Sequence, residues 1–147
     1  MSNLRDLYQD VIIEHSQHPR NFRECASANH VKDGYNPLCG DKVAVYVTEK
    51  NGVIEDICFK GDGCAISMAS ASLLSEVLKG KSVGEVLELF EEFKKMVTTG
   101  NAQASKLGKL AVLAGVAEFP IRVKCATLVW HTLKAALCDE KNKVTTE

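Results

Sequence analysis

Three of the six cysteines in this chain have neighbours that favour chemistry over simple packing. They lie in the segments Asn36-Pro37-Leu38-Cys39-Gly40-Asp41, Gly61-Asp62-Gly63-Cys64 and Arg122-Val123-Lys124-Cys125. Each follows a turn or a chain-breaking residue, or has a charged residue beside it. A cysteine that only fills a core needs no such neighbours, whereas a thiolate that binds a soft metal or handles sulfur does. We therefore expect a cluster of thiolates.

A carboxylate can join the three sulfurs. Asp41 follows Cys39 by two residues, so a curled loop can aim both side chains at one point. Cys64 and Cys125 are predicted at helix N-termini, where the helix dipole lowers a thiol pKa. Three sulfurs and one oxygen would complete a tetrahedral zinc shell. Soft thiolates also accept iron and copper, so the residues alone leave the metal open.

The spacing of these residues matches no compact zinc-finger pattern, so their convergence depends on the fold. The net negative charge of such a shell would be partly offset by basic neighbours, namely Lys42, Lys60, Arg122 and Lys124.

The other three cysteines show less sign of binding a metal or handling sulfur. Cys58 is predicted inside a strand as a small hydrophobe. Cys25 falls in a loop, where nothing supports a redox role, and Cys138 is too far along the last helix to share a metal with Cys125. A framework of three disulfides would require export, for which the N-terminus has no apolar signal region.

Three histidines are weaker candidates for metal ligands. His15 and His18 are three residues apart near a predicted helix end, a spacing that can bind metal, but favourable placement of an imidazole at a helix C-terminus is the simpler interpretation. His131 is predicted to face away from Cys125 on their shared helix.

Composition places the chain among ordinary globular proteins. It has 147 residues, of which 46% are hydrophobic and 25% charged, with a formal net charge of −1. We expect one domain over residues 1–147, with frayed ends at 1–3 and 140–147. The charge predicts no nucleic-acid binding, and no apolar run is long enough to span a membrane. A cytoplasmic protein with reduced thiols is expected.

The first part of the chain predicts a helix and a hairpin. Leu4–His15 has helical spacing of apolar residues and is ended by Pro19, and residues 20–38 read as loop with at most a short strand. Strands over Lys42–Glu49 and Val53–Lys60 flank an Asn-Gly turn. In the second strand, Val53, Glu55, Ile57 and Phe59 are predicted to share one face.

The second part predicts four helices. The expected ranges are Ala65–Leu78, a helix from a Ser82–Glu85 capping box to Met96, Lys106–Val116 and Ala126–Leu137. A hairpin-based sheet followed by helices indicates an α+β fold: an antiparallel sheet of about three strands with helices mainly on one face.

The three cysteine segments, extended to Ile66-Ser67 and Ala126-Thr127-Leu128-x-Trp130, resemble the SufU branch of the IscU/NifU-like family. The N-terminal Leu7-Tyr8, His15 and Pro19-Arg20-Asn21 resemble it too, so the likeness runs from about residue 4 to residue 138. It implies an IscU-like α+β fold and a metal held by Cys39, Asp41, Cys64 and Cys125. It also implies iron–sulfur cluster biogenesis beside a SufS-type cysteine desulfurase and downstream assembly proteins.

Two differences from the IscU scaffolds favour a sulfur acceptor over a cluster scaffold. Lys124 stands where those scaffolds carry a histidine, and the stretch before Cys125 is longer, as in SufU-type proteins. The resemblance therefore implies a zinc-dependent persulfide acceptor, a sulfurtransferase. The alternatives are a scaffold assembling a [2Fe–2S] cluster on the same ligands and a structural-zinc module. Cys39 is the predicted acceptor because a loop residue can leave a metal without unwinding a helix, and Cys125 is the alternative.

Overall fold

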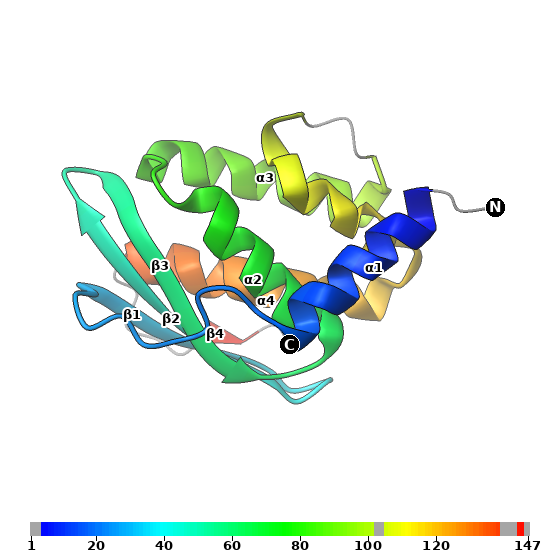
Figure 1. The fold of residues 1–147 in the computed structure, drawn as a ribbon, viewed down its shortest axis with the longest axis horizontal. Helices are drawn as coiled ribbons and strands as arrows, with labels where there is room; N and C mark the ends of the chain where they lie inside the picture. The colour runs from blue at the N-terminus through cyan, green and yellow to red at the C-terminus, as the bar shows by residue number, and fades with distance from the viewer. Residues whose placement is uncertain (1–3, 102–104, 139–143, 146–147) are drawn as a thin grey trace.

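A mixed sheet with helices on one side forms the molecule (Figure 1). The computed structural model describes residues 4–101, 105–138 and 144–145. Its strands are β1 (His30–Asn36), β2 (Asp41–Lys50), β3 (Val53–Asp62) and β4 (Val144–Thr145), in the order β3-β2-β1-β4. Its helices are α1 (Leu4–Gln17), α2 (Ala65–Leu78), α3 (Val83–Thr99), the 3₁₀ segment η1 (Ser105–Glu118) and α4 (Pro120–Leu137). The predicted α+β class, with three antiparallel strands, is confirmed.

The expected frayed C-terminus is wrong at one point. Val144–Thr145 pairs with β1 as a short parallel strand. The other residues expected to fray, 1–3, 140–143 and 146–147, lie outside the described residues. Among the described helices, none has the length and apolar character needed to cross a membrane.

The predicted hairpin of β2 and β3 is confirmed, with one error of register. Asn51 and Gly52 both have positive φ, as the tight turn between right-twisted strands requires. Glu55, however, is an extra residue in β3, because Thr48 pairs with Asp56 while Glu49 pairs with Ile54. This bulge moves Glu55 to the exposed side, so only Ile57 and Phe59 of the predicted set are buried.

α2 matches its predicted boundaries, whereas α1 and α3 run past their predicted ends to Gln17 and Thr99, and the last two segments differ more. α2 spans Ala65–Leu78, and the capping box of Ser82 and Glu85 opens α3. α4 begins at Pro120 and not at Ala126, because proline suits the first turn of a helix and therefore starts this element. The segment before it is 3₁₀ with a break at Gly108, and not one continuous α-helix. β1 occupies a region expected to be mainly loop.

The core lies between the sheet and the helices. Val43, Val45 and Val47 of β2 face it, and Trp130 of α4 stacks between Phe90 and Phe93 of α3, with ring centroids 5.4 and 5.1 Å apart. α4 packs against β1 and β2. At Gly34 a Cβ atom would collide with Thr132, so this glycine lets α4 approach β1 closely. The approach fixes α4, and with it Cys125, relative to the strands.

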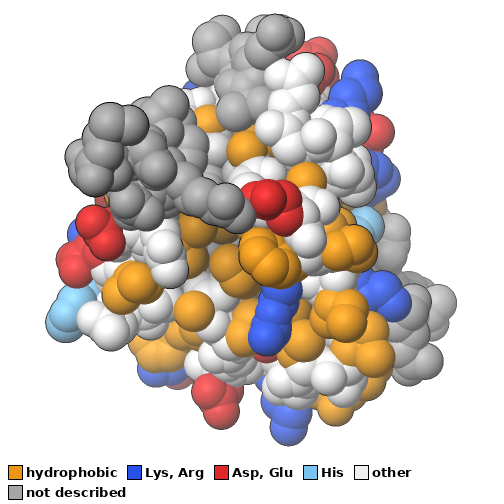
Figure 2. All heavy atoms as spheres, turned by 90° about the vertical axis from the view of Figure 1, so that its right-hand side faces the viewer, with side chains coloured by type: hydrophobic (Ala, Val, Ile, Leu, Met, Phe, Trp, Pro, Cys, Tyr) orange, Lys and Arg blue, Asp and Glu red, His pale blue; other side chains and the backbone are white. Residues whose placement is uncertain are grey.

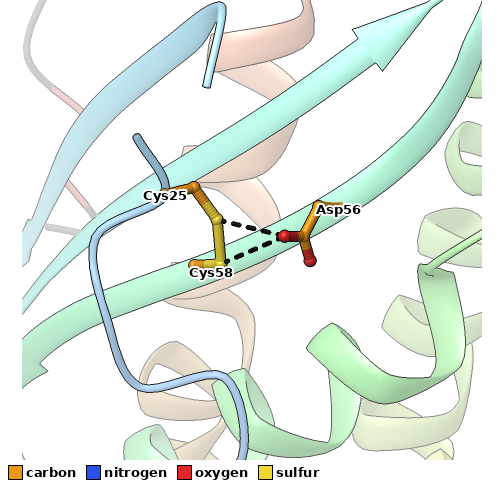
Figure 3. Close-up of side chains that lie close together, drawn as sticks. All are labelled: Cys25, Asp56 and Cys58. Carbon is orange, nitrogen blue, oxygen red and sulfur yellow. Dashed lines mark hydrogen bonds between the residues drawn. A yellow bond between two sulfur atoms is a disulfide. The ribbon is translucent and has the colours of Figure 1, made fainter. Parts of the chain in front are cut away.

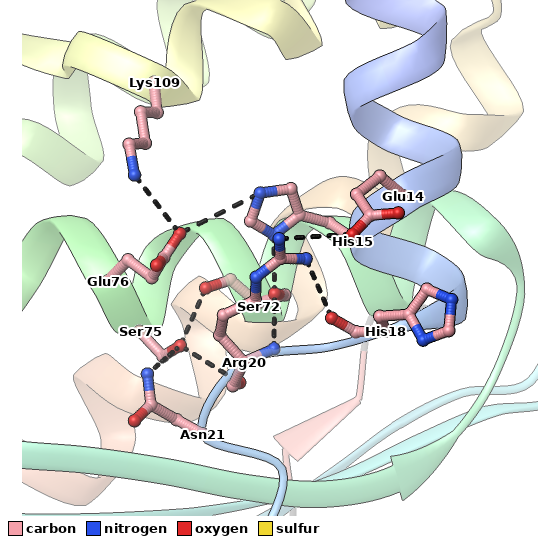
Figure 4. Close-up of polar contacts among 9 residues, drawn as sticks. All are labelled: Glu14, His15, His18, Arg20, Asn21, Ser72, Ser75, Glu76 and Lys109. Carbon is pink, nitrogen blue, oxygen red and sulfur yellow. Dashed lines mark hydrogen bonds and ion pairs between the residues drawn. The ribbon is translucent and has the colours of Figure 1, made fainter.

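A buried histidine joins α1 to α2 (Figure 4). The Nδ1 atom of His15 lies 2.7 Å from Ser72 Oγ, and its Nε2 atom lies 3.8 Å from Glu76. Ser72 Oγ also accepts the backbone N–H of Arg20 at 2.9 Å, so this hydroxyl contacts both α1 and the chain that follows it. Burial, followed by the positive charge of Arg20, lowers the pKa of His15. His15 lies in the last turn of α1, as predicted, but its burial favours the neutral ring, so its main contacts are with α2 and not with the helix end.

We predict that the free energy of unfolding decreases as the pH is lowered below 6.5, because of His15. The unfolded chain binds a proton there near pH 6.5, whereas the folded chain binds it only at lower pH, so protonation favours unfolding. The free energy of unfolding, measured by denaturant titration at several pH values, should decrease with a slope of at most about 1.4 kcal/mol per pH unit for one proton. His15→Gln should flatten this slope, while His18→Gln at an exposed position should not. Equal slopes in wild type and His15→Gln would contradict the prediction.

Candidate metal centre

Four side chains from separate elements meet at one end of the sheet. Cys39 lies in the turn between β1 and β2, Asp41 is the first residue of β2, Cys64 is the N-cap of α2, and Cys125 lies in α4. The ligand atoms of Cys39, Asp41 and Cys125 all lie within 4.8 Å of one another. Cys125 Sγ is 3.2 Å from Cys39 Sγ, and Cys64 Sγ is 3.9 Å from Asp41 Oδ2. The structure thus brings the four predicted ligands together, with Cys64 at the edge of the group.

Asp41 organises this group. Its side chain is fully buried, and its Oδ1 atom accepts the backbone N–H of Cys64 at 2.8 Å. A Cβ atom at Gly63 would stand 2.7 Å from that same Oδ1, so glycine is needed for the carboxylate to reach the turn. Cys64 in turn accepts the backbone N–H of Ser67 at 3.4 Å, which caps α2. The Gly-Asp-Gly segment therefore serves to place Cys64 beside Asp41.

Asn36 is a member of the site that the sequence analysis did not identify. It is fully buried, and its Nδ2 group donates to Asp41 Oδ2 at 3.2 Å and to Cys125 Sγ at 3.4 Å. Its backbone oxygen accepts the N–H of Gly40 at 2.9 Å, which shapes the turn that carries Cys39. The sequence signal that could have identified Asn36 is an asparagine followed by a proline. This pattern is typical of turns in which the asparagine side chain bonds to the backbone of the turn.

Arg122 is the basic residue in contact with the sulfurs. Its Nη1 atom lies 3.5 Å from Cys39 Sγ and 3.9 Å from Cys125 Sγ. The hydrogen bond to Cys125, with the charges of Cys64, Cys125 and Cys39, raises the pKa of Arg122. Lys42 and Lys60 instead line a shallow pocket on the other face of the sheet, with Asp33, Gly34 and Tyr35. Lys124 is half-buried beside Cys125 in the chain.

The expected lowering of the Cys125 pKa is wrong. α4 begins at Pro120, so Cys125 lies past the first turn, where the effect of the helix dipole has faded. Burial, together with hydrogen bonds to Cys39, Asp41 and Cys64, raises the pKa of the Cys125 thiol above its usual value. Without a cation in the site, this thiol resists ionisation.

Two cysteines set aside by the sequence analysis are bonded to each other. Cys25 and Cys58 form a disulfide, with Cα atoms 6.0 Å apart (Figure 3). The interpretation of Cys58 as a small hydrophobe and the expectation of uniformly reduced thiols are therefore wrong, because the loop that carries Cys25 lies against β3. Cys138 is an exposed free thiol at the end of α4, away from Cys125 of that helix. The ring of the exposed His131 makes a T-shaped contact with the ring of Phe90, with centroids 5.0 Å apart.

The surroundings of Cys39 include exposed apolar side chains. Leu38 precedes it and is 63% exposed, and Phe119 and Ile121, at the start of α4 near Arg122, are 57% and 65% exposed. Cys39 itself is half-buried, whereas Cys125 is fully buried. Figure 2, which views the molecule from the right-hand side of Figure 1, shows hydrophobic side chains at the surface with basic side chains between them. Cys39 is thus the more accessible sulfur of the close pair.

Comparisons with known proteins agree with this architecture. The model of the NifU-like N terminal domain matches residues 7–145. The iron–sulfur cluster assembly scaffold protein IscU of Streptococcus pyogenes serotype M1 is 41% identical over 97% of this chain and 89% of its own length. The zinc-dependent sulfurtransferase SufU of Bacillus subtilis is 38% identical over 95% of each chain.

A solved structure gives the same result at the level of the fold. The crystal structure of a protein from Fervidobacterium islandicum AW-1, described as a candidate cluster assembly scaffold for the SUF system, superposes with a TM-score of 0.83. It is 33% identical, and the match covers 90% of this chain and 98% of that one. The chain belongs to the NifU-like N-terminal domain family, which includes the IscU and SufU proteins of iron–sulfur cluster assembly.

Proposed function

We propose that this protein is a zinc-dependent acceptor of persulfide sulfur from a SufS-type cysteine desulfurase in iron–sulfur cluster biogenesis. The observation that carries the proposal is the meeting of Cys39, Asp41 and Cys125, with Cys64 beside them, under the guanidinium of Arg122. The similarity to a relative named as a zinc-dependent sulfurtransferase supports it.

The donor set fits zinc. Tetrahedral zinc takes thiolate and carboxylate ligands at about 2.3 and 2.0–2.2 Å, so its ligand atoms lie roughly 3–4 Å from one another. The sulfurs of Cys39 and Cys125, 3.2 Å apart, and the 3.9 Å from Cys64 to Asp41 are of that order. Cys39, Asp41, Cys64 and Cys125 would hold the ion. When bound, zinc would keep the thiols ionised despite their burial, which matters most for Cys125.

Cys39 is the proposed nucleophile. Its thiolate attacks the outer sulfur of the desulfurase persulfide, a new S–S bond forms on Cys39, and the desulfurase cysteine leaves as a thiolate. The sulfur atom and its proton move together, so no oxidant or reductant is needed. Cys39 is half-buried in a turn and Cys125 is fully buried in a helix, so an incoming persulfide reaches Cys39 first.

Two features near Cys39 suit this transfer. Arg122 Nη1 lies 3.5 Å from Cys39 Sγ, which places a fixed positive charge where negative charge passes between sulfurs. The exposed Leu38 and Ile121 offer apolar surface that a partner protein would cover while docked. Covering these residues would exclude water and protect the persulfide.

The second candidate is a scaffold that assembles a [2Fe–2S] cluster on the same residues. It is favoured by the printed names of relatives, since IscU of Streptococcus pyogenes is named as a scaffold. Metal analysis and an absorption spectrum of anaerobically purified protein distinguish the two. Near-stoichiometric zinc and a colourless solution support the acceptor, and visible charge-transfer bands with bound iron support the scaffold.

We predict that Cys39→Ala abolishes sulfur acceptance, because the nucleophile is lost. The assay incubates the protein with a SufS-type desulfurase and free cysteine and detects the added sulfur by peptide mass mapping. In wild type the sulfur should reside on Cys39, and Cys138→Ala, which removes an exposed thiol far along α4, should accept sulfur normally. Undiminished acceptance by Cys39→Ala, or sulfur mapped to Cys125, would refute the assignment.

Asn36→Ala should weaken zinc binding, because its amide orients both Asp41 and Cys125. Loss of such a partner typically costs roughly 10- to 100-fold in metal affinity. Competition with a chromophoric chelator measures the dissociation constant. Asn29→Ala is the matched control. Asn29 immediately precedes β1, at the end of the strand opposite to Asn36, and it bonds to Glu49 of β2. An unchanged affinity in Asn36→Ala would rule out this role.

A further inference from the structure

The chain between α1 and β1 crosses the sheet on the face that the helices leave open. We call residues 18–29 the crossing segment. At the sheet edge, the oxygen of Asn21 accepts the backbone N–H of Phe59 in β3 at 3.0 Å. Further along, Glu24 accepts from the hydroxyl of Tyr46 at 3.2 Å, and Ser27 Oγ lies 3.2 Å from Thr48 Oγ1. Tyr46 and Thr48 alternate with the core-facing valines of β2, so the segment lies on the outer face.

The Cys25–Cys58 disulfide fastens the middle of this segment. Cys58 shares the outer face with its strand partner Tyr46, and Cys25 lies directly over it. Both cysteines are buried, with 6% and 0% of their surfaces exposed. The bond joins positions separated by 33 residues and is the one disulfide among the described cysteines.

A charged cluster surrounds the two sulfurs (Figure 3). Asp56 Oδ2 lies 3.5 Å from Cys25 Sγ and 3.8 Å from Cys58 Sγ. Arg23 of the crossing segment pairs with that oxygen at 3.0 Å, and Lys79, at the end of α2, pairs with Oδ1 at 3.0 Å. Burial raises the pKa of Asp56, but the hydrogen bonds from Lys79 and Arg23 outweigh it and leave the pKa lowered. The carboxylate is therefore charged and ties the crossing segment to both β3 and α2.

These groups suit reversible redox chemistry. The two sulfurs and the Asp56 oxygen form a group separate from the one at Cys39, Asp41 and Cys125. After reduction, each thiol has a carboxylate acceptor already in place, so the buried S–H groups are satisfied. Arg23 Nη1, 3.3 Å from Cys25 Sγ, supplies a cation that attracts an approaching thiolate. The same contacts therefore accommodate both redox states.

We propose that Cys25 and Cys58 form a reversible thiol–disulfide switch, whose disulfide state fixes the crossing segment to β3 and whose dithiol state lets the segment detach. The reductant is a dithiol. One of its thiolates attacks Cys25, the less buried sulfur, and Cys58 leaves as a thiolate that takes up a proton beside Asp56. The second thiol of the reductant then displaces Cys25, so two electrons pass to the switch and the reductant becomes a disulfide.

The test follows each cysteine in wild-type protein at graded ratios of reduced to oxidised dithiothreitol, a dithiol, with acid quenching, alkylation and peptide mapping. Cys25 and Cys58 should lose alkylation together as the buffer becomes oxidising. Hydrogen exchange of the crossing segment, and of the Phe59 amide, should be roughly tenfold or more faster in the dithiol state. The proposal fails if both cysteines remain alkylated at every ratio, or if exchange is equal in the two states.

Variants of Cys25, Cys138 and Asp56 test the proposed switch further. Cys25→Ser should show the fast exchange in every buffer, while Cys138→Ser should behave as wild type. Asp56→Asn should be reduced roughly tenfold faster by dithiothreitol, because it removes both the repulsion of an incoming thiolate and the ion pairs that hold the segment closed. An unchanged rate would exclude this role of Asp56. The experiment involves neither zinc nor a desulfurase, so its outcome is independent of the proposed function.

Discussion

The buried carboxylate of Asp41 is the group on which the arrangement of the site depends. Removing a carboxylate from water is costly unless hydrogen bonds or a cation compensate it. Here the Cys64 backbone and the Asn36 amide compensate it, at 2.8 and 3.2 Å, and these contacts tie the N-terminus of α2 and the end of β1 to the start of β2. Asn36 then reaches Cys125, so the hydrogen bonds of one carboxylate and one amide bring three sulfurs from three elements to the same place.

The two cysteine groups differ in ways that follow from their positions. Cys39 and Cys64 lie at the ends of elements, where backbone N–H groups and a basic side chain are available to a sulfur anion. Cys25 and Cys58 lie face to face between a loop and a strand, both buried, with a carboxylate that disfavours thiolates. The first setting suits a metal and nucleophilic sulfur, and the second suits a neutral disulfide or dithiol. One small fold thus holds two separate sulfur environments.

Local signals predicted most of the elements, and contacts between distant residues account for what was missed. The Asn51-Gly52 turn and the Ser82 capping box are determined by a few adjacent residues, so they were predictable. The bulge at Glu55 depends on pairing with β2, and the Cys25–Cys58 bond depends on where a loop without periodicity is laid down. Pro120 was misassigned because a proline can follow one helix or begin the next. The grouping of Cys39, Asp41, Cys64 and Cys125 came from residue chemistry and family resemblance, but Asn36 required coordinates.

The most direct test of the central claim is X-ray absorption at the zinc edge on the zinc-loaded protein. If Cys39, Asp41, Cys64 and Cys125 hold the ion together, the first shell should contain three sulfurs at about 2.3 Å and one oxygen at about 2.0–2.2 Å. A first shell of nitrogen and oxygen atoms with one sulfur or none would contradict the account.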